Sequence, residues 1–208
     1  MIEKLYENNQ TVIAGEFISE FIYSHETFAE KFYTVYISVP RQSGSADILP
    51  VTVPERLFDI NLDCRGFNAL ISGQLRSYDK QVCDGLKTKL VLSVFAKEIK
   101  LLDELPDSSR TNTVTLDGYI CKPPIYRKTP LGREISDLLL AVNRSYGKSD
   151  YIPCICWGRN AKYMETRIIG DQIKVIGRIQ SREYQKKISE AEAEIRIAYE
   201  VSVSRLEH

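Results

Sequence analysis

The sequence predicts an all-β fold made of two similar domains. Its 208 residues exceed the usual size of one small β domain and suit two domains of about 100 residues each. Hydrophobic residues make up 43% of the chain, and the 12 Tyr, the 7 Phe and frequent Val and Ile favour strands over helices. The third observation is an internal repeat, which indicates where each domain lies.

The repeat appears when the sequence is aligned with itself at an offset of 103 residues. This offset places Gly15 on Gly118. It also places residues 47–51, Asp-Ile-Leu-Pro-Val, on residues 150–154, Asp-Tyr-Ile-Pro-Cys. Several landmarks at one offset are hard to obtain by chance, so we interpret the chain as a duplication.

One inserted residue later, Gly73 falls on Gly177. The duplication divides the sequence into a first repeat at 1–102, a linker at 103–111 that is rich in Asp, Ser and Pro, and a second repeat at 112–205. The linker is too short to let two domains tumble freely.

Alternation of apolar residues with a period of two marks five strands in each repeat. In the second repeat the expected strands are 114–120, 135–143, 151–157, 171–180 and 195–205. In the first repeat they are 11–21, 31–39, 48–53, 69–76 and 88–101. A helix is expected at 160–168, where Ala161, Met164 and Ile168 share one face, and a shorter one after Pro54. Five strands with a helix after the third is the order of the OB-fold, a small Greek-key barrel.

The charge is uneven between the repeats although the whole chain is neutral. Residues 1–111 hold 12 Lys and Arg against 16 Asp and Glu, a net charge of −4. Residues 112–205 hold 16 against 11, a net charge of +5. Because a basic domain favours a polyanionic partner, we expect most of the binding surface in the second repeat.

Several kinds of site are disfavoured. The five Cys residues are an odd count, and Cys154 and Cys156 alternate on one strand, so both should point into a core as reduced packing residues. Neither His25 nor a second Cys pair stands at ligand spacing, so no metal and no cofactor is expected. The sequence contains no phosphate loop or nucleophile–base pair, which argues against an enzyme.

Residues 206–208 resemble the start of an affinity tag, so we expect them to have no part in the function.

No run of about 18 to 20 apolar residues could span a bilayer, and the first residues do not form a signal-peptide pattern. We therefore expect a cytoplasmic protein.

Four stretches of the second repeat resemble the bacterial single-stranded DNA-binding proteins, or SSBs. In family order they are Asn112 to Gly118, Leu140 to Arg144, Tyr151 to Gly158 and Ile176 to Arg182. The first repeat resembles the same family more faintly, through its glycine positions and its Asp-Ile-Leu-Pro strand. The resemblance implies two OB-folds in each chain and assembly as a homodimer that holds four OB-folds.

In the resembling family, bases stack on aromatic side chains at four places. Matching position by position puts Tyr146, Tyr151, Trp157 and Tyr184 there. Alternation places Tyr151 and Trp157 on the strand face opposite the cysteines, toward a ligand. Each stack is typically worth about 1 to 3 kcal/mol. The alternative for each ring is packing in a core or an interface.

Cations that would contact phosphates lie beside those aromatics and around the two loops with which OB-folds grip oligonucleotides. The predicted set is Lys122, Arg127, Lys128, Arg144, Arg159, Arg178, Arg182 and Lys186. Ordinary solvation explains any one of these side chains, so the clustering is what favours a phosphate-binding surface.

The first repeat departs from this pattern. The positions that match the four aromatic residues of the second repeat hold, in order, Ser43 or Gly44, Ile48 or Leu49, Pro54 and Lys80. Its stacking platform is therefore largely missing, and we expect it to supply assembly surface, with some guidance of the strand through Arg41, Arg76 and Lys80.

The leading hypothesis is noncatalytic, sequence-independent binding of single-stranded DNA at the nucleoid, in replication, recombination or repair, with proteins of those processes as partners. A primosome-type accessory protein that acts mainly through protein contacts is the alternative, favoured by the altered first repeat and by the lack of an acidic tail after Val203. An OB-fold interaction or RNA-binding module also stays open, because this fold hosts many functions.

Overall fold

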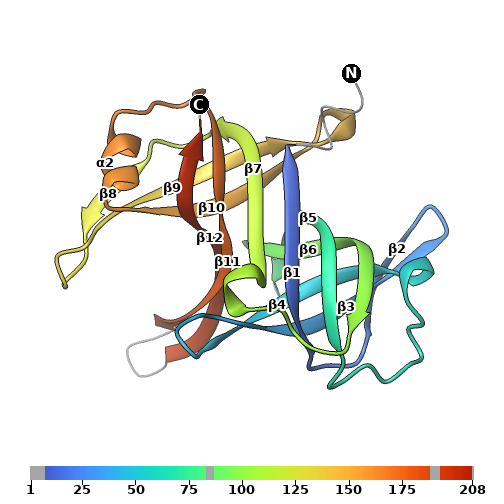
Figure 1. The fold of residues 1–208 in the computed structure, drawn as a ribbon. Helices are drawn as coiled ribbons and strands as arrows, with labels where there is room; N and C mark the ends of the chain where they lie inside the picture. The colour runs from blue at the N-terminus through green and yellow to red at the C-terminus, as the bar shows by residue number, and fades with distance from the viewer. Residues whose placement is uncertain (1–7, 83–86, 188–192, 208) are drawn as a thin grey trace.

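The computed structural model describes residues 8–82, 87–187 and 193–207, and these form two OB-folds side by side (Figure 1). The strands of the first repeat are β1 (Asn9–Phe17), β2 (Ile22–Thr27), β3 (Glu30–Pro40), β4 (Ala46–Pro54), β5 (Asn68–Val82) and β6 (Lys87–Leu102). Those of the second are β7 (Asn112–Ile120), β8 (Ile125–Lys128), β9 (Glu134–Asn143), β10 (Ser149–Trp157), β11 (Gln172–Lys187) and β12 (Ala193–Glu207). The helical segments are η1 (Glu55–Leu57), η2 (Ser108–Arg110), η3 (Ser145–Gly147) and α2 (Arg159–Glu165).

Each repeat closes a ring of five strands, as the sequence predicts. In the first, the hydrogen-bonded order β1-β5-β6-β4-β3 returns to β1; in the second, β7-β11-β12-β10-β9 returns to β7. The closing pairings are short, and a pairing between β1 and β7 joins both rings into one twelve-stranded sheet.

Strand ends and the helix differ from the expectation in ways that have local causes. The first strand ends at Phe17 instead of 21, because the chain turns where the Ser19 hydroxyl accepts a hydrogen bond from the backbone N–H of Tyr36. The helix α2 buries Ala161 and Met164 as predicted, but it ends at Glu165 and leaves Ile168 69% exposed. The prediction that Ile168 belongs to the packed helix face is therefore wrong.

The strands β2 and β8 were not expected. All six residues of β2 are exposed, and β8 is only four residues long, so neither shows the apolar alternation that identifies a half-buried strand. The last strand β12 includes Leu206 and Glu207: Leu206 packs against the core, and Glu207 pairs with Lys174 at 2.8 Å. Both residues therefore take part in the fold, which a tag remnant would not be expected to do.

The repeated glycines lie where two strands cross closely. A Cβ on Gly15 would meet the carbonyl oxygen of Ser38, and one on Gly118 would meet that of Ala141. Gly73 and Gly177 lie against backbone carbonyls of β6 and β12, each next to a register shift in its strand pairing. Only glycine fits such an approach, which is why the glycine landmarks survive in both repeats.

The two repeats face each other across an approximate two-fold axis. The central antiparallel strands β1 and β7 run side by side in Figure 1, with Thr11 opposite Val114. Since these two residues occupy the same place in the two repeats, the axis passes through this pair. Near the ends of the pairing, Asn9 binds the backbone N–H and C=O of Leu75, at 2.9 and 2.7 Å. The matching Asn112 binds those of Ile179 at the same distances.

A buried carboxylate links each repeat to the other. Asp47 is fully buried, pairs with Arg41 through both carboxylate oxygens, and accepts hydrogen bonds from the backbone N–H and the hydroxyl of Ser181. The Arg41 guanidinium also donates to the Ser181 carbonyl oxygen at 3.0 Å. We call this group of three residues the first clasp.

The second clasp repeats this arrangement on the other side of the axis. Asp150, 1% exposed, pairs with Arg144 and accepts from the backbone N–H of Ser77 at 2.6 Å. Arg144 donates to the Ser77 carbonyl oxygen at 2.9 Å.

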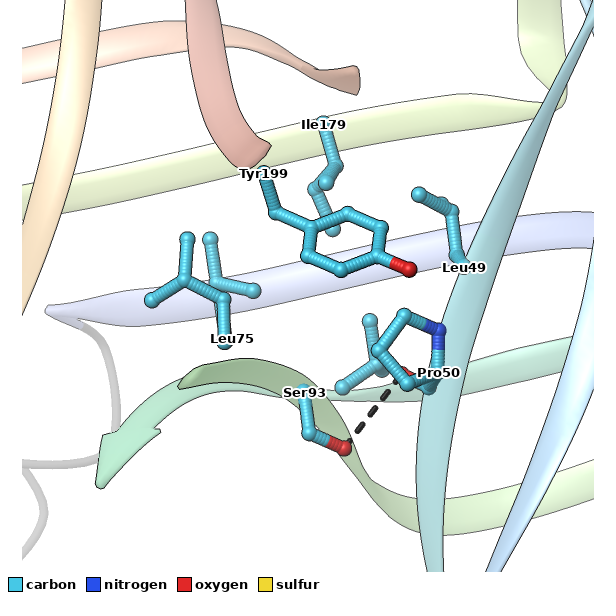
Figure 2. Close-up of a pocket in the computed structure, with 8 residues that line it drawn as sticks. Leu49, Pro50, Leu75, Ser93, Ile179 and Tyr199 are labelled. Atoms are coloured by element: carbon cyan, nitrogen blue, oxygen red, sulfur yellow. Dashed lines mark hydrogen bonds between the residues drawn. The ribbon is translucent and has the colours of Figure 1, made fainter. Parts of the chain in front are cut away.

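Apolar side chains fill the seam between the clasps. Figure 2 shows Tyr199 of the second repeat lying against Leu49, Pro50 and Leu75 of the first, with Ile179 beside them. The Ser93 hydroxyl donates to the Pro50 carbonyl oxygen at 3.3 Å. Burial raises the pKa of Tyr199 to about 12, so its hydroxyl stays protonated in the seam.

We expect Asp47→Ala to lower the free energy of unfolding by about 3 to 5 kcal/mol, because it leaves the Arg41 charge partly buried without its partner. Urea unfolding followed by circular dichroism measures the loss. Asp63→Ala is the control, since Asp63 pairs with Arg65 on the open surface and should matter little. Equal losses in the two variants would contradict a structural role for the clasp.

Candidate nucleic-acid interface

Strand β10 separates a core face from an outer face, as its sequence alternation predicts. Ile152, Cys154 and Cys156 are at most 3% exposed and belong to the core. Tyr151, on the opposite face, is 46% exposed. The prediction that both cysteines pack in the core is confirmed. Burial raises the pKa of Cys156 to about 12 and raises that of Cys154 as well, so neither thiol ionises near neutral pH.

Trp157 ends β10 on the same face as Tyr151 and is half-buried. Its indole Nε1–H donates to the hydroxyl of Ser202 on β12 at 3.1 Å, which fixes the ring against the neighbouring strand. The next residue, Gly158, has a φ of 53° and turns the chain into α2. The ring is therefore held by one edge, and part of its surface stays open to solvent.

The other two predicted stacking residues lie on separate elements. Tyr184 is half-buried on β11, in register with Arg196 of β12. Tyr146 has its backbone in η3, and its side chain lies outside the described part of the structure, as does that of Lys186 on β11.

The predicted cations fall into an exposed group and a paired group. Lys122, Lys128 and Arg159 are exposed to solvent. Arg127 pairs with Asp137 at 2.8 Å, and Arg182 lies 3.8 Å from Glu200, both near the surface. The exposed charges are thus concentrated around the β8–β9 hairpin and the start of α2.

Arg144 has a structural partner that sequence reasoning did not find. It belongs to the second clasp, with 29% of its side chain exposed. The spacing of Arg41 to Asp47 is the same as that of Arg144 to Asp150, and this repeated pattern was the available signal. Arg178 lies 3.8 Å from the buried carboxylate of the first clasp and is 41% exposed.

The β8–β9 hairpin adds apolar surface that the sequence did not indicate. Ile125 is 63% exposed and Leu131 is 84% exposed, next to the basic residues Arg127 and Lys128. Such a mixture of open apolar and cationic side chains suits a ligand with flat bases and charged phosphates.

Within the described ranges, no group of three His, Cys, Asp or Glu side chains is arranged to hold a metal ion. No helix in the same ranges is long and apolar enough to cross a bilayer.

Two closed five-strand rings, one with aromatic and basic side chains on its outer face, define a tandem OB-fold protein with a candidate nucleic-acid surface. Residues 111–207 match the single-strand binding protein family. Single-stranded DNA-binding protein B of Bacillus subtilis is 34% identical over 86 residues, which cover 36% of this chain and 74% of that protein. The chain belongs to the single-strand binding protein family.

Other relatives are matched over a smaller share of their length. Single-stranded DNA-binding protein 1 of Staphylococcus aureus is 35% identical over 83 residues, which cover 36% of this chain and 50% of that protein. Single-stranded DNA-binding protein A of Bacillus subtilis is 34% identical over 83 residues, with 36% and 48% covered. The chain spans about half the length of these two curated relatives.

Solved structures resemble both repeats together. The wild-type single-stranded DNA binding protein from Thermus aquaticus superposes with a TM-score of 0.69 over 96% of this chain and 91% of that chain, at 22% identity. A deletion mutant of the same protein gives a TM-score of 0.72 over 96% and 93%, also at 22% identity. At this identity the likeness shows the fold, and it extends across the whole tandem arrangement.

Because the side chain of Cys156 lies on the core face of β10, we expect it to react slowly with alkylating reagents. At pH 8, a thiol with a pKa of about 12 is ionised in only about one molecule in ten thousand, so Cys156 should resist brief alkylation by iodoacetamide. Mass spectrometry of the digested protein measures the modification, and the same treatment in guanidinium chloride is the control. Rapid alkylation of Cys156 in the native protein would place its side chain on the outer face instead.

Proposed function

We propose that this protein binds single-stranded DNA without sequence preference, mainly through its second repeat. The observation that carries the proposal is the outer face of β10, where Tyr151 is 46% exposed and Trp157 is half-buried, with the exposed Arg159 two residues further along the chain. Tyr184 on β11 and Tyr146 in η3 belong to the same proposed set of stacking residues.

Binding would combine two interactions that do not depend on base identity. Every base has a flat face that stacks on an aromatic ring, and every nucleotide has a phosphate that a cation neutralises. Lys122, Lys128 and Arg159 are the exposed cations best placed for phosphates. Affinity should fall as salt rises, because bound phosphates release counterions. No covalent step is involved, so we propose a noncatalytic role in replication, recombination or repair.

The first repeat is a poor stacking site. Ile48, which the offset of 103 places on Tyr151, is aliphatic and half-buried, and Pro54, at the position that matches Trp157, is buried. With a net charge of −4 over residues 1–111, this repeat would also repel a polyanion. We therefore assign to it a supporting role through the clasps and the seam.

Replacing the aromatic side chains tests the proposal. Trp157→Ala, Tyr151→Ala and Tyr184→Ala should each weaken binding of a labelled oligo-dT by about 1 to 3 kcal/mol, roughly 5- to 150-fold in Kd, measured by fluorescence anisotropy at fixed low salt. In the unmodified protein the single Trp should be quenched as oligo-dT is added.

Tyr23→Ala is the matched control, because Tyr23 is an exposed tyrosine, at 57%, on β2 of the acidic first repeat. It should bind like the unmodified protein. Absence of both quenching and binding at low salt would contradict the proposal and favour the accessory-protein hypothesis. Tighter binding to oligo-U than to oligo-dT of the same length would favour the RNA-binding hypothesis.

We also propose that two chains associate as a homodimer, which would bring four OB-folds together. The support is the family membership and the open ends of the sheet, where β2 and β8 each have one hydrogen-bonded neighbour among the described strands. Static light scattering at micromolar concentration should give twice the chain mass of 23.8 kDa. A mass that stays at one chain over the whole concentration series would contradict this proposal and leave the DNA-binding proposal intact.

A further inference from the structure

A polar cavity of about 330 Å³ lies at the junction of the two repeats. The turn at residues 40–43 and Asp47 of the first repeat form part of its wall; Ser108 and Ser109 of η2 and Arg178 of β11 complete it. This volume is at the lower end of the range for small-molecule sites. Neither repeat forms the cavity alone.

The cavity has an excess of positive charge. Among the described residues that line it, the one carboxylate is that of Asp47, which is fully buried and already accepts hydrogen bonds from Arg41 and Ser181 in the first clasp. Two guanidinium groups face this single carboxylate, from Arg41 and from Arg178. The hydrogen bond to Asp47 raises the pKa of Arg41. Two guanidinium groups against one carboxylate leave one positive charge over.

The second clasp has a neutral residue at the position of Arg178. There, Asp150 pairs with Arg144. The place of Arg178 is taken by Gln74, since Gly73 matches Gly177 and the asparagine contacts of Leu75 and Ile179 match as well. At this position the two clasps therefore differ: Arg178 lines the cavity at the first clasp, whereas Gln74 at the second accepts a hydrogen bond from Arg76 at 3.1 Å.

Few contacts with the rest of the protein hold the side chain of Arg178. Within the described part of the chain it donates no hydrogen bond, and its partner is the Asp47 carboxylate at 3.8 Å. Its side chain is 41% exposed. Its N–H groups are thus available to an acceptor in the cavity.

We propose that this cavity binds a phosphate group, with Arg178 as the main contact and Arg41 as a second. A guanidinium presents parallel N–H donors that match two oxygens of a phosphate, and the hydroxyls of Ser43, Ser108 and Ser109 lie on the same wall as further donors. The phosphate is either part of a bound single strand, in which case the inference rests on the proposed function, or part of a free phosphate or nucleotide.

Arg178→Gln is the direct test, because it gives the first clasp the residue that the second clasp already has. In thermal unfolding, inorganic phosphate should raise the Tm of the unmodified protein by about 2 to 4 °C over chloride at equal ionic strength and pH. We expect Arg178→Gln to abolish this rise and Arg178→Lys to retain part of it. Ser109→Asp, an exposed change that adds a negative charge to the wall, should abolish it as well.

Lys100→Gln is the control for the loss of one positive charge, since Lys100 is 61% exposed on β6 and does not line the cavity. It should respond to phosphate like the unmodified protein.

A second measurement separates the two sources of phosphate. It is the slope of the logarithm of the binding constant for oligo-dT against the logarithm of the salt concentration. Loss of one strand phosphate contact in Arg178→Gln should reduce this slope by about 0.7.

A changed slope supports a strand phosphate, and a lost phosphate response with an unchanged slope supports a free phosphate or nucleotide. If Arg178→Gln leaves both the phosphate response and the slope as they are in the unmodified protein, the cavity does not bind phosphate. If the chain fails to bind oligo-dT at all, the proposed function fails, while the Tm response to phosphate still decides for or against the cavity.

Discussion

The structure depends on the approximate two-fold contact between its two repeats. One OB-fold of this size leaves the edge of its first strand open, and here β1 and β7 cover each other. The pairing is accompanied by the two asparagine contacts and by two clasps that each bury a carboxylate at no more than 1% exposure. Because each clasp joins an Arg–Asp pair of one repeat to a Ser of the other, its hydrogen bonds are complete only when both repeats are folded and docked.

Much of this arrangement can be predicted from the sequence, because the constraints act on single residues at fixed places. Gly15 and Gly73 lie where backbones approach too closely for a Cβ, so their counterparts had to stay glycine after the duplication. The buried strands alternate as expected, since one face of each packs on a core. Strands without a buried face, β2 above all, give no such pattern and could not be found this way.

The site was less predictable than the fold, because the sequence does not show which partner a charged side chain will meet. Arg144 and Arg178 have the same chemistry, yet the first is paired with a buried carboxylate of its own repeat and the second faces a carboxylate that already has a partner. Only the docking of the repeats decides this difference. The aromatic residues of β10 were easier to place, since alternation along one strand is a local property.

The duplication has diverged on its surfaces and not at its internal contacts. The glycines, the asparagine contacts and the Arg–Asp–Ser clasps remain in both repeats; the first two maintain close strand contacts within a repeat, and the clasps join one repeat to the other. The outer faces carry no such constraint, so the two repeats could come to differ in net charge and in the residues at the four aromatic positions. The exchange of Gln74 for Arg178 changes the charge at one position beside the clasps, and the neighbouring contacts change with it: Gln74 accepts a hydrogen bond from Arg76, whereas Gln180, which matches Arg76, donates to Glu200. The guanidinium of Arg178 is left beside a cavity with both repeats in its wall, and this geometry is the basis for proposing a phosphate ligand there.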